Sequence, residues 1–321
     1  MAPVFARTED VVRSAYNLLL DREPEPAGLH HWTWTLDNGL SREEFVRAIL
    51  ASDEFKAKMA DAERLTPFND VDLIIPVSGH ELRVPASDRA IVPYLLKYRC
   101  WEPHLSRYLV RELDTSDVLV DVGANVGYFT VLCAPLVKRV VAFEPVAKTY
   151  RYCQANVALN HLANVDLYPY GLWHENTTLS LRRDSLGVNA AVASSGDVAG
   201  ADSINVVTLD YLVESGLLEM PGLDMVKLDV EGAELSVLMG MRATIARFFP
   251  RIVMELNRPM LSTFGLSVDH IWDFLRGFQY EIRAFASWLE QNPVPVADLG
   301  ELKQLCPPDA LIDIVASVSP A

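Results

Sequence analysis

The chain has 321 residues, of which half are apolar and 22% are charged, a composition typical of globular proteins. Its length is about twice that of a usual single domain, which favours two domains or one large domain with an appendage. The 28 basic and 43 acidic residues give a formal net charge of −15. A protein of that sign is repelled by nucleic-acid phosphates and by anionic lipid headgroups, so we expect no nucleic-acid partner.

The four cysteines, at positions 100, 133, 153 and 306, form no C-x-x-C pair and show no spacing typical of metal ligands. We expect them to be reduced and buried, which favours a cytoplasmic location. Charged residues interrupt the N-terminal apolar stretch, and no uncharged apolar run approaches the roughly 18 residues of a membrane helix. The sequence therefore predicts neither a signal peptide nor a membrane span.

Residues 1–66 are predicted to form a small all-α domain, because apolar residues recur there at helical spacing. One helix start is well marked: Ser41 is placed to cap it, Glu44 to bond back to the cap amide, and Leu40 to pack against Phe45. This start should therefore be visible as a capping box.

The same N-terminal region resembles the DUF4214 repeat, a small helical module of bacterial proteins. The resemblance covers about residues 8–60 and rests on the segments Tyr16–Pro24, Gly28–Leu29, Trp32, Asn38–Ser41 and Ser52–Phe55. It implies no chemistry, and we expect His30, His31 and Trp32 to pack in a core or interface. The module is a candidate for contact with a protein partner or for self-association.

Proline and glycine begin to punctuate the sequence near residue 67, so we assign residues 67–321 to a second domain. A hairpin is expected between Leu73–Ile75 and Glu81–Val84, followed by a helix over Pro103–Leu113. Short apolar runs then alternate with helical segments, which predicts an α/β domain with a parallel sheet covered on both faces. The runs expected as strands are Val118–Val122, Val140–Phe143, Val165–Tyr168, Met225–Leu228 and Ile252–Leu256. The stretch Arg182–Asn205, rich in Gly, Ser and Ala, is the longest predicted loop, and a loop of that length is either disordered or a lid.

The turn after the first strand of this domain is the expected ligand site, because open parallel sheets bind ligands beyond the carboxyl ends of their strands. It contains Gly123 and Gly127, which allow a tight turn and the close approach of a nucleoside. Glu144 ends the next strand, 21 positions after Gly123, where a carboxylate can accept hydrogen bonds from both ribose hydroxyls.

Dinucleotides and S-adenosylmethionine both use such a turn, and the glycine pattern distinguishes them. A dinucleotide fingerprint that begins at Gly123 requires glycine at positions 125 and 128, where pyrophosphate contacts a bare backbone. Asn125 and Tyr128 occupy those positions. The sequence therefore favours S-adenosylmethionine and opposes a nicotinamide oxidoreductase.

Five motifs in this domain together resemble the FkbM family of methyltransferases, over about residues 90–257. They are Asp121–Gly127, Phe143–Pro145, Asn156 with Leu159–Asn160, Thr208–Asp210 and Val226–Glu234. The resemblance implies a class I, Rossmann-like sheet of seven strands with the last antiparallel, closed by a hairpin near Tyr280 and Leu311–Ala316. It also implies methyl transfer from S-adenosylmethionine to a hydroxyl of a glycan, a glycolipid or a polyketide-like metabolite.

The expected cofactor site combines the turn with other strand-end residues. Asp121 is placed to complement the positive charges of the cofactor, although it can instead cap the following helix. Glu102 matches an acidic position of the family and can hold the ammonium group, or cap the next helix. The pair Gly171–Leu172 resembles the segment that lines the adenine, and its alternative is a simple turn. The residues predicted to bind the cofactor are Glu102, Asp121, Gly123, Asn125, Gly127, Glu144, Gly171 and Leu172.

A general base is also needed, because an alcohol that accepts a methyl group must lose its proton. We predict Asp229 as the base or the residue that orients the acceptor, assisted by Glu231, which shares its face if both are extended. Clustered carboxylates raise one another's proton affinity. The alternative is that Asp229 caps a helix beginning at Glu231. Glu255 ends the next strand and faces the same crevice, and a divalent metal held by such carboxylates is left open.

The histidines at positions 104, 161, 174 and 270 are scattered and are expected to be surface or packing residues. A function of another class, a non-catalytic scaffold that retains a nucleoside and is recruited through the helical module, is the alternative to an enzyme. The acids at positions 121, 144, 229 and 231 argue against it, because all four are present.

Overall fold

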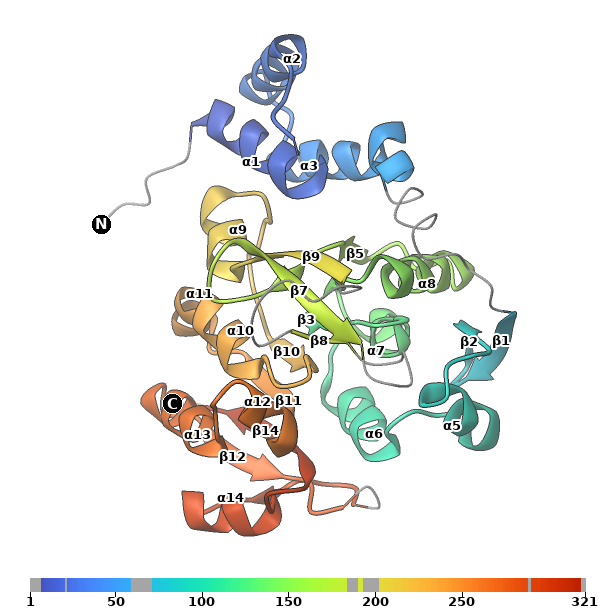
Figure 1. Cartoon of the computed structure of the whole chain (residues 1–321), viewed down its shortest axis with the longest axis vertical. Coiled ribbons are helices and arrows are strands. Elements are labelled where there is room, and N and C mark those ends of the chain that lie inside the picture. Colours follow the sequence, from blue (N-terminus) through green and yellow to red (C-terminus); the bar gives the residue numbers. More distant parts are fainter. Residues whose placement is uncertain are drawn as a thin grey trace.

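The structure of the protein is a computed structural model, which describes residues 7–20, 22–58, 71–183, 190–192, 202–287 and 290–318. A helical region lies at one end of a larger α/β body (Figure 1). Within the described residues, none of the helices combines the length and the apolar character that crossing a bilayer requires.

The helical region consists of α1 (Thr8–Leu20), α2 (Pro26–Asp37) and α3 (Arg42–Ala51). The predicted capping box is confirmed, because the Ser41 side chain accepts the Glu44 amide and the Glu44 side chain accepts the Ser41 amide. Trp32 packs as expected: its indole N–H donates to the Tyr16 hydroxyl at 3.1 Å. His30 and His31 are exposed, so they do not pack in a core, and the other part of the expectation, packing in an interface, stays a prediction.

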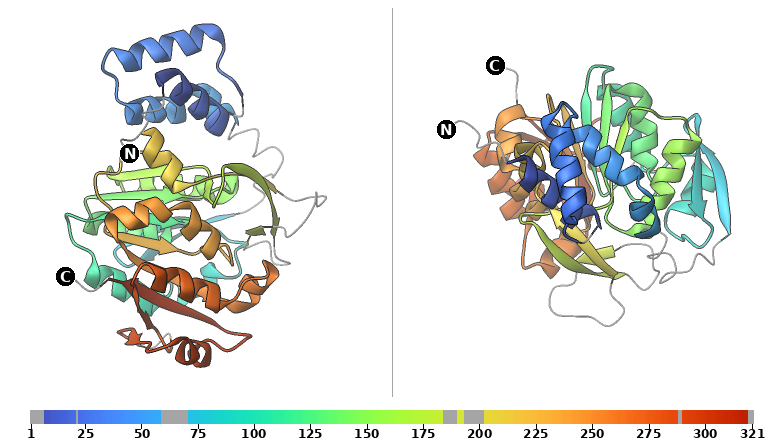
Figure 2. Two further views of the ribbon diagram at one scale, coloured as in Figure 1. Left: turned by 90° about the vertical axis from the view of Figure 1, so that its left-hand side faces the viewer. Right: turned by 90° about the horizontal axis from the view of Figure 1, so that it is seen from above.

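The helical region is joined to the α/β body by a shared core and by ion pairs. Buried side chains of α1 and α3 belong to the same apolar cluster as those of α9 (Leu209–Ser215), which lies next to them in Figure 2. Asp166 binds Arg47 of α3 at 2.5 Å and Arg139 of the body at 2.6 Å. Ser14 of α1 accepts a hydrogen bond from the Tyr211 hydroxyl at 2.6 Å. The predicted boundary between residues 66 and 67 lies outside the described residues.

A two-stranded hairpin and two helices precede the main sheet. Strands β1 (Asp72–Val77) and β2 (His80–Pro85) pair in antiparallel register, which confirms the predicted hairpin. Helices α5 (Ile91–Tyr98) and α6 (Pro103–Glu112) follow. Their apolar side chains and the inner residues of the hairpin form part of a second core cluster, against one face of the sheet.

The main sheet has eight strands in the order β13-β12-β14-β11-β10-β3-β4-β5. Its strands are β3 (Val118–Val122), β4 (Arg139–Phe143), β5 (Val165–Tyr168), β10 (Met225–Leu228), β11 (Arg251–Asn257), β12 (Glu281–Ala284), β13 (Val294–Pro295) and β14 (Leu311–Ser317). The five runs predicted as strands all lie in it, in parallel order, and β14 is antiparallel to β11. The seven-stranded sheet is thus confirmed, with the two-residue β13 added at its edge. The last two strands of the seven, β12 and β14, pair without forming a simple hairpin, because β13 and α14 (Leu299–Leu305) lie between them.

Helices cover both faces of this sheet, as the alternating sequence pattern predicted. Leu119 packs in one core cluster and its neighbour Val120 in the other, because successive side chains of a strand point to opposite faces. The helices that complete the layers are α7 (Tyr128–Cys133), the 3-10 turn η1 (Ala134–Leu136), α8 (Ala147–Leu159), α10 (Glu234–Gly240), α11 (Arg242–Phe248), α12 (Arg258–Thr263) and α13 (Val268–Gly277). The carboxyl ends of β3, β4, β10 and β11 consequently share one edge of the sheet.

A smaller sheet corrects the prediction of one long loop over Arg182–Asn205. Its strands are β6 (Gly171–Leu172), β7 (Thr177–Arg183), β8 (Ala190–Val192) and β9 (Asp202–Val207), in the order β6-β9-β7-β8. The ends of the predicted loop are therefore strands, because β7 and β9 pair along Thr177↔Val206 to Leu181↔Asp202. Residues 184–189 and 193–201 of the predicted loop lie outside the described residues.

Candidate active site

The turn between β3 and α7 is held in shape by close packing against two neighbouring segments. Gly123, Asn125 and Gly127 all have positive φ, at 81°, 53° and 87°. A Cβ on Gly123 would lie 1.9 Å from the backbone oxygen of Asp229, and one on Gly127 would lie 2.7 Å from the sulfur of Cys153. The glycines therefore let the end of β10 and helix α8 approach the turn, a reason that the sequence did not reveal.

Glu144 ties this turn to the end of the neighbouring strand β4. Its Oε2 accepts the backbone N–H of Asn125 at 2.8 Å, and its Oε1 accepts the N–H of Val146 at 2.9 Å and the hydroxyl of Thr149 at 2.7 Å. Burial raises the pKa of Glu144, and these hydrogen bonds act in the opposite direction. The carboxylate thus connects the turn after β3 with the turn after β4, at the position where the sequence predicted a ribose-binding group.

Asp121 forms a buried ionic group with Lys227 of β10. Its Oδ2 accepts the Thr130 hydroxyl at 2.6 Å, while its Oδ1 lies 3.9 Å from the Lys227 ammonium and accepts no hydrogen bond from the described residues. Burial raises the pKa of Asp121, and Lys227 opposes that rise. The alternative role of Asp121 at the start of the following helix stands beside this one, because its carboxylate also accepts a hydrogen bond from the backbone N–H of Thr130 in the first turn of α7.

Lys227 is a charged residue inside an otherwise apolar central strand. It is 3% exposed, and its Nζ lies 3.1 Å from Asp229 Oδ2 and 4.7 Å from the centre of the Phe129 ring. Burial lowers the pKa of Lys227, but Asp229 and Asp121 outweigh that effect and hold the pKa above its ordinary value. Lys227 is therefore a cation at neutral pH, which offsets part of the surrounding negative charge.

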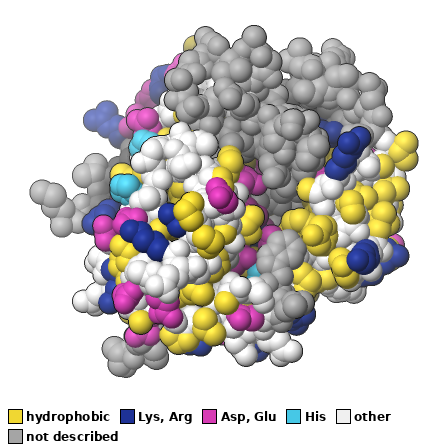
Figure 3. Space-filling model, turned by 60° about the horizontal axis from the view of Figure 1, so that its bottom comes forward, with side chains coloured by type: hydrophobic (Ala, Val, Ile, Leu, Met, Phe, Trp, Pro, Cys, Tyr) yellow, Lys and Arg dark blue, Asp and Glu magenta, His cyan; other side chains and the backbone are white. Residues whose placement is uncertain are grey.

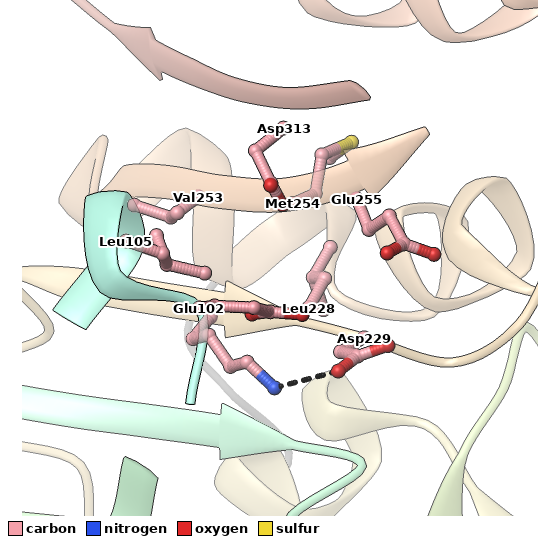
Figure 4. A pocket seen from close by; sticks show the side chains of 9 residues that line it. Glu102, Leu105, Leu228, Asp229, Val253, Met254, Glu255 and Asp313 are labelled. Carbon is pink, nitrogen blue, oxygen red and sulfur yellow. Dashed lines mark hydrogen bonds and ion pairs between the residues drawn. The ribbon is translucent and has the colours of Figure 1, made fainter. Parts of the chain in front are cut away.

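Four carboxylates line a narrow pocket between α6 and the carboxyl ends of β10 and β11 (Figure 4). They are Glu102, Asp229, Glu255 and Asp313, with Lys227 and the apolar side chains of Leu105, Leu228, Val253 and Met254. Burial, followed by the nearby Asp313 and Asp229, raises the pKa of Glu102 well above its usual value. Burial and the same neighbours raise the pKa of Glu255 to about 9, so this group is protonated at neutral pH. The pocket therefore contains both hydrogen-bond donors and acceptors.

Asp229 and Glu255 line the same pocket, whereas Glu231 does not line it, although its negative charge helps to raise the pKa of Glu102 and of Glu255. Glu231 has a φ of 51° in the left-handed region, so it does not continue the extended chain that would have given it and Asp229 a shared face. Its carboxylate accepts a hydrogen bond from Asn257 at 3.5 Å. The alternative in which Asp229 caps a helix is also wrong, because α10 begins at Glu234 without a side-chain cap.

The predicted adenine segment, Gly171–Leu172, is a buried strand rather than a turn. It forms β6, in which Gly171 pairs with Val206. A Cβ on Gly171 would lie 3.5 Å from the ring of Pro145, the residue that follows Glu144. This segment therefore lies beside the turn after β4 and is not part of the acidic pocket.

Sequence reasoning assigned no role to Lys227 and missed Asp313, both of which line the pocket. His104, expected to be a packing residue, is fully buried with its Nε2 2.6 Å from Asp313 Oδ2 and its ring 5.0 Å from that of Phe285. The signal that could have revealed Lys227 and Asp313 is a charged residue within an apolar strand. In the described part of the chain, no group of three or more His, Cys, Asp or Glu side chains is arranged to hold a metal ion.

The parallel sheet with an antiparallel penultimate strand, and the glycine turn bridged to an acidic strand end, define a class I methyltransferase fold. Residues 121–282 match the Methyltransferase FkbM domain, and residues 6–59 match the domain of unknown function DUF4214. The chain belongs to the FkbM family of methyltransferases. The family and the enzyme class predicted from the sequence are confirmed.

Relatives from an archaeon, a fungus and a bacterium are similar to this chain. The hexuronic acid methyltransferase AglP of Haloferax volcanii is 35% identical over 171 residues, which cover 53% of this chain and 68% of AglP. Methyltransferase 1 of Beauveria bassiana is 27% identical over 169 residues, covering 46% of this chain and 68% of the relative. The crystal structure of methyltransferase FkbM from Methylobacillus flagellatus aligns with a TM-score of 0.40 and 16% identity, over 96% of this chain and 60% of that one.

Proposed function

We propose that the protein transfers a methyl group from S-adenosylmethionine to a hydroxyl oxygen of a glycan or glycolipid. The observation that carries the proposal is the junction of Glu144, the turn at Gly123 and the backbone of Asp229, at the adjoining ends of β4, β3 and β10. The 35% identity to AglP, whose name describes a methyltransferase of hexuronic acid, supports a sugar acceptor over a polyketide-like one.

The residues at the turn suit an adenosyl cofactor with a cationic amino-acid tail. Oε2 of Glu144 accepts one hydrogen bond from the described residues, whereas Oε1 accepts two, so Oε2 has capacity for a ribose hydroxyl. The orphan Oδ1 of Asp121 and the buried carboxyl group of Glu102 offer acceptors for positively charged groups. Gly171 and Leu172 lie next to the Glu144 turn, where they would line the adenine. The cofactor supplies an electrophilic methyl group.

The acidic pocket provides the groups needed to orient an alcohol and to remove its proton. Asp229 is the proposed base, and the ammonium of Lys227 at 3.1 Å fixes the position of its carboxylate. Glu255, protonated because of its raised pKa of about 9, can donate a hydrogen bond to a second oxygen of the sugar. Because methyl transfer is an in-line displacement, these residues act mainly by holding the acceptor oxygen about 3 Å from the methyl carbon. Glu231 does not line the pocket, but its carboxylate adds negative charge beside Glu255, and an assisting role for it stays part of the proposal.

Residues 67–321 are proposed to carry this activity, with residues 1–66 as a separate helical domain. The four cysteines are all free thiols, which supports the proposed cytoplasmic location. A contact with a protein partner through the helical domain stays a prediction from the sequence.

The proposal is tested by measuring the binding of S-adenosylhomocysteine and NAD by calorimetry, and methyl transfer to a panel of neutral sugars, uronic acids and glycolipids. We expect Asp229→Asn to lower turnover by about 100- to 10,000-fold, because a positioned base contributes that much. Its affinity for S-adenosylhomocysteine should change by less than roughly threefold, or about 0.7 kcal/mol. Asp273→Asn, on the exposed side of α13, is the matched control. Binding of NAD in place of S-adenosylhomocysteine, or full turnover by Asp229→Asn, would contradict the proposal.

A further inference from the structure

Helix α5 exposes an apolar face to solvent beside the acidic pocket. Its inner side chains, Ile91, Val92 and Leu95, are buried in the core. Its outer face consists of Pro93, Tyr94, Leu96, Lys97 and Tyr98, and we call these five residues the α5 face. Tyr94, Leu96 and Tyr98 are 38%, 49% and 53% exposed. Aromatic and aliphatic side chains that gather on a surface in this way indicate a contact with another apolar surface.

The aromatic side chains of the α5 face form a connected group. The rings of Tyr94 and Tyr98 lie 5.8 Å apart, and Tyr94 meets the half-buried Trp101 edge-on at 5.3 Å. The ammonium of Lys97 lies 4.6 Å from the centre of the Tyr98 ring. Tyrosine and tryptophan rings flanked by lysine are typical of the interface between a bilayer and water.

The segment that carries the α5 face, residues 89–101, has a charge opposite in sign to that of the whole protein. Arg89, Lys97 and Arg99 are exposed, and no acidic residue occurs between Arg89 and Trp101. Figure 3 shows apolar side chains bordered by Lys and Arg on the side of the molecule where Figure 1 places α5. The net charge of −15 repels an anionic surface at long range. Salt screens charges that are more than about 8 Å away, so the basic residues nearest to the surface determine whether a close contact is favourable.

The α5 face is linked to the proposed methyl-acceptor site through Trp101. Trp101, which contacts Tyr94, is followed by Glu102, whose carboxyl group lines the acidic pocket. A surface that touched the α5 face would therefore lie next to the groups that bind the sugar. This proximity connects the apolar face to the choice of acceptor.

We propose that the α5 face docks on an anionic lipid surface and that the acceptor is a glycan anchored in that surface. The proposal rests on the proposed function for its sugar site, but the docking depends only on the α5 face and on the flanking basic residues Arg89 and Arg99. The tyrosines enter the headgroup region, the basic residues contact anionic headgroups, and the lipid-anchored sugar reaches the pocket past Trp101. Charge complementarity favours this occupant over a second copy of the chain, which would bring two basic faces together.

The docking is tested by co-sedimentation of the full chain with phosphatidylcholine vesicles, with and without phosphatidylglycerol. We expect binding only to the vesicles that contain phosphatidylglycerol, and weaker binding as salt is raised. The double variant Arg89→Gln/Lys97→Gln should bind roughly 25-fold more weakly, because each basic residue near an anionic surface contributes a factor of about five. Tyr94→Ser/Tyr98→Ser should also lose binding. Trp34→Ser, which removes an aromatic residue 60% exposed on α2, should bind like the unchanged protein.

Two parallel measurements separate this proposal from its alternatives. Absence of vesicle binding, or equal binding by the Tyr94→Ser/Tyr98→Ser variant, overturns the docking. If light scattering shows a dimer that the Tyr94→Ser/Tyr98→Ser variant abolishes, and no vesicle binding is found, the α5 face is a self-association surface. That result also overturns the docking proposal. Calorimetry with S-adenosylhomocysteine should give the same affinity for all the variants. Failure to bind that compound, with vesicle binding intact, would refute the proposed function and leave the docking surface standing.

Discussion

Replacing Glu144 with alanine tests where the ribose of the cofactor binds. We expect the affinity for S-adenosylhomocysteine to fall by about 2–4 kcal/mol, on the order of 30- to 1000-fold, because hydrogen bonds to a charged group are lost. The same carboxylate also accepts hydrogen bonds from the backbone N–H groups of Asn125 and Val146 and from the Thr149 hydroxyl. The loss of affinity must therefore be separated from a loss of stability.

The structure allows the stability effect of Glu144→Ala to be bounded. Two part-buried backbone donors lose their acceptor, at a cost of about 1–3 kcal/mol each, so the free energy of unfolding should fall by roughly 2–6 kcal/mol. Thr149 contributes less, because its single hydroxyl proton can be donated to the Val146 carbonyl oxygen, 3.1 Å away, once Oε1 is gone. Urea unfolding without ligand measures this part, and calorimetry below the unfolding transition measures the affinity.

Thr149→Val is the matched control for Glu144→Ala. It removes one hydrogen bond to Oε1 and leaves Oε2, the oxygen proposed to face the ribose, with its bond to Asn125. We expect a stability loss of about 1 kcal/mol and an affinity within roughly threefold of the unchanged protein. If Glu144→Ala loses stability but keeps its affinity, the ribose does not bind at this carboxylate and the assignment is refuted.

The other predictions concern the turn, the domain contact and the acidic pocket. Gly123→Ala should lower the free energy of unfolding by more than about 3 kcal/mol and abolish cofactor binding, because its Cβ would lie 1.9 Å from a backbone oxygen. Gly277→Ala is the control: its Cβ meets nothing within 4 Å, so this variant should be close to neutral in thermal unfolding. Asp166→Ala should lower the free energy of unfolding by about 3 kcal/mol, because Arg47 and Arg139 lose a buried partner. An unchanged midpoint of urea unfolding would argue against these ion pairs. Glu255 has a folded pKa of about 9, above the ordinary 4.5, so its contribution to stability is complete below pH 4.5 and is lost as the pH rises toward 9. Glu255→Gln should therefore become more stable relative to the unchanged protein between pH 5 and pH 9, and parallel stability curves would show that Glu255 is not buried as described.

The sequence by itself determined the strands of the main sheet and the start of α3. Parallel strands buried on both faces are nearly continuous apolar runs, so Val118–Val122 and Met225–Leu228, each with one charged residue, are recognisable without any partner. A capping box such as that of Ser41 and Glu44 is likewise local, because its two hydrogen bonds join residues three apart. The small sheet escaped prediction because β9 is stabilised by pairing with β7, more than twenty positions earlier in the chain.

For the site, the sequence identified the acids at the strand ends but could not show which of them meet. Glu231 does not line the pocket, because its left-handed backbone ends the extended strand, and a Cβ on the next residue, Gly232, would lie 2.8 Å from the backbone of Met260. Asp313 joins Glu255 only because β14 returns antiparallel beside β11, which places the two residues opposite each other. Burial in the folded protein then raises the pKa of Glu102 and of Glu255. Periodicity and turn chemistry are properties of neighbouring residues, whereas burial and the approach of distant carboxylates arise only when the whole sheet has assembled.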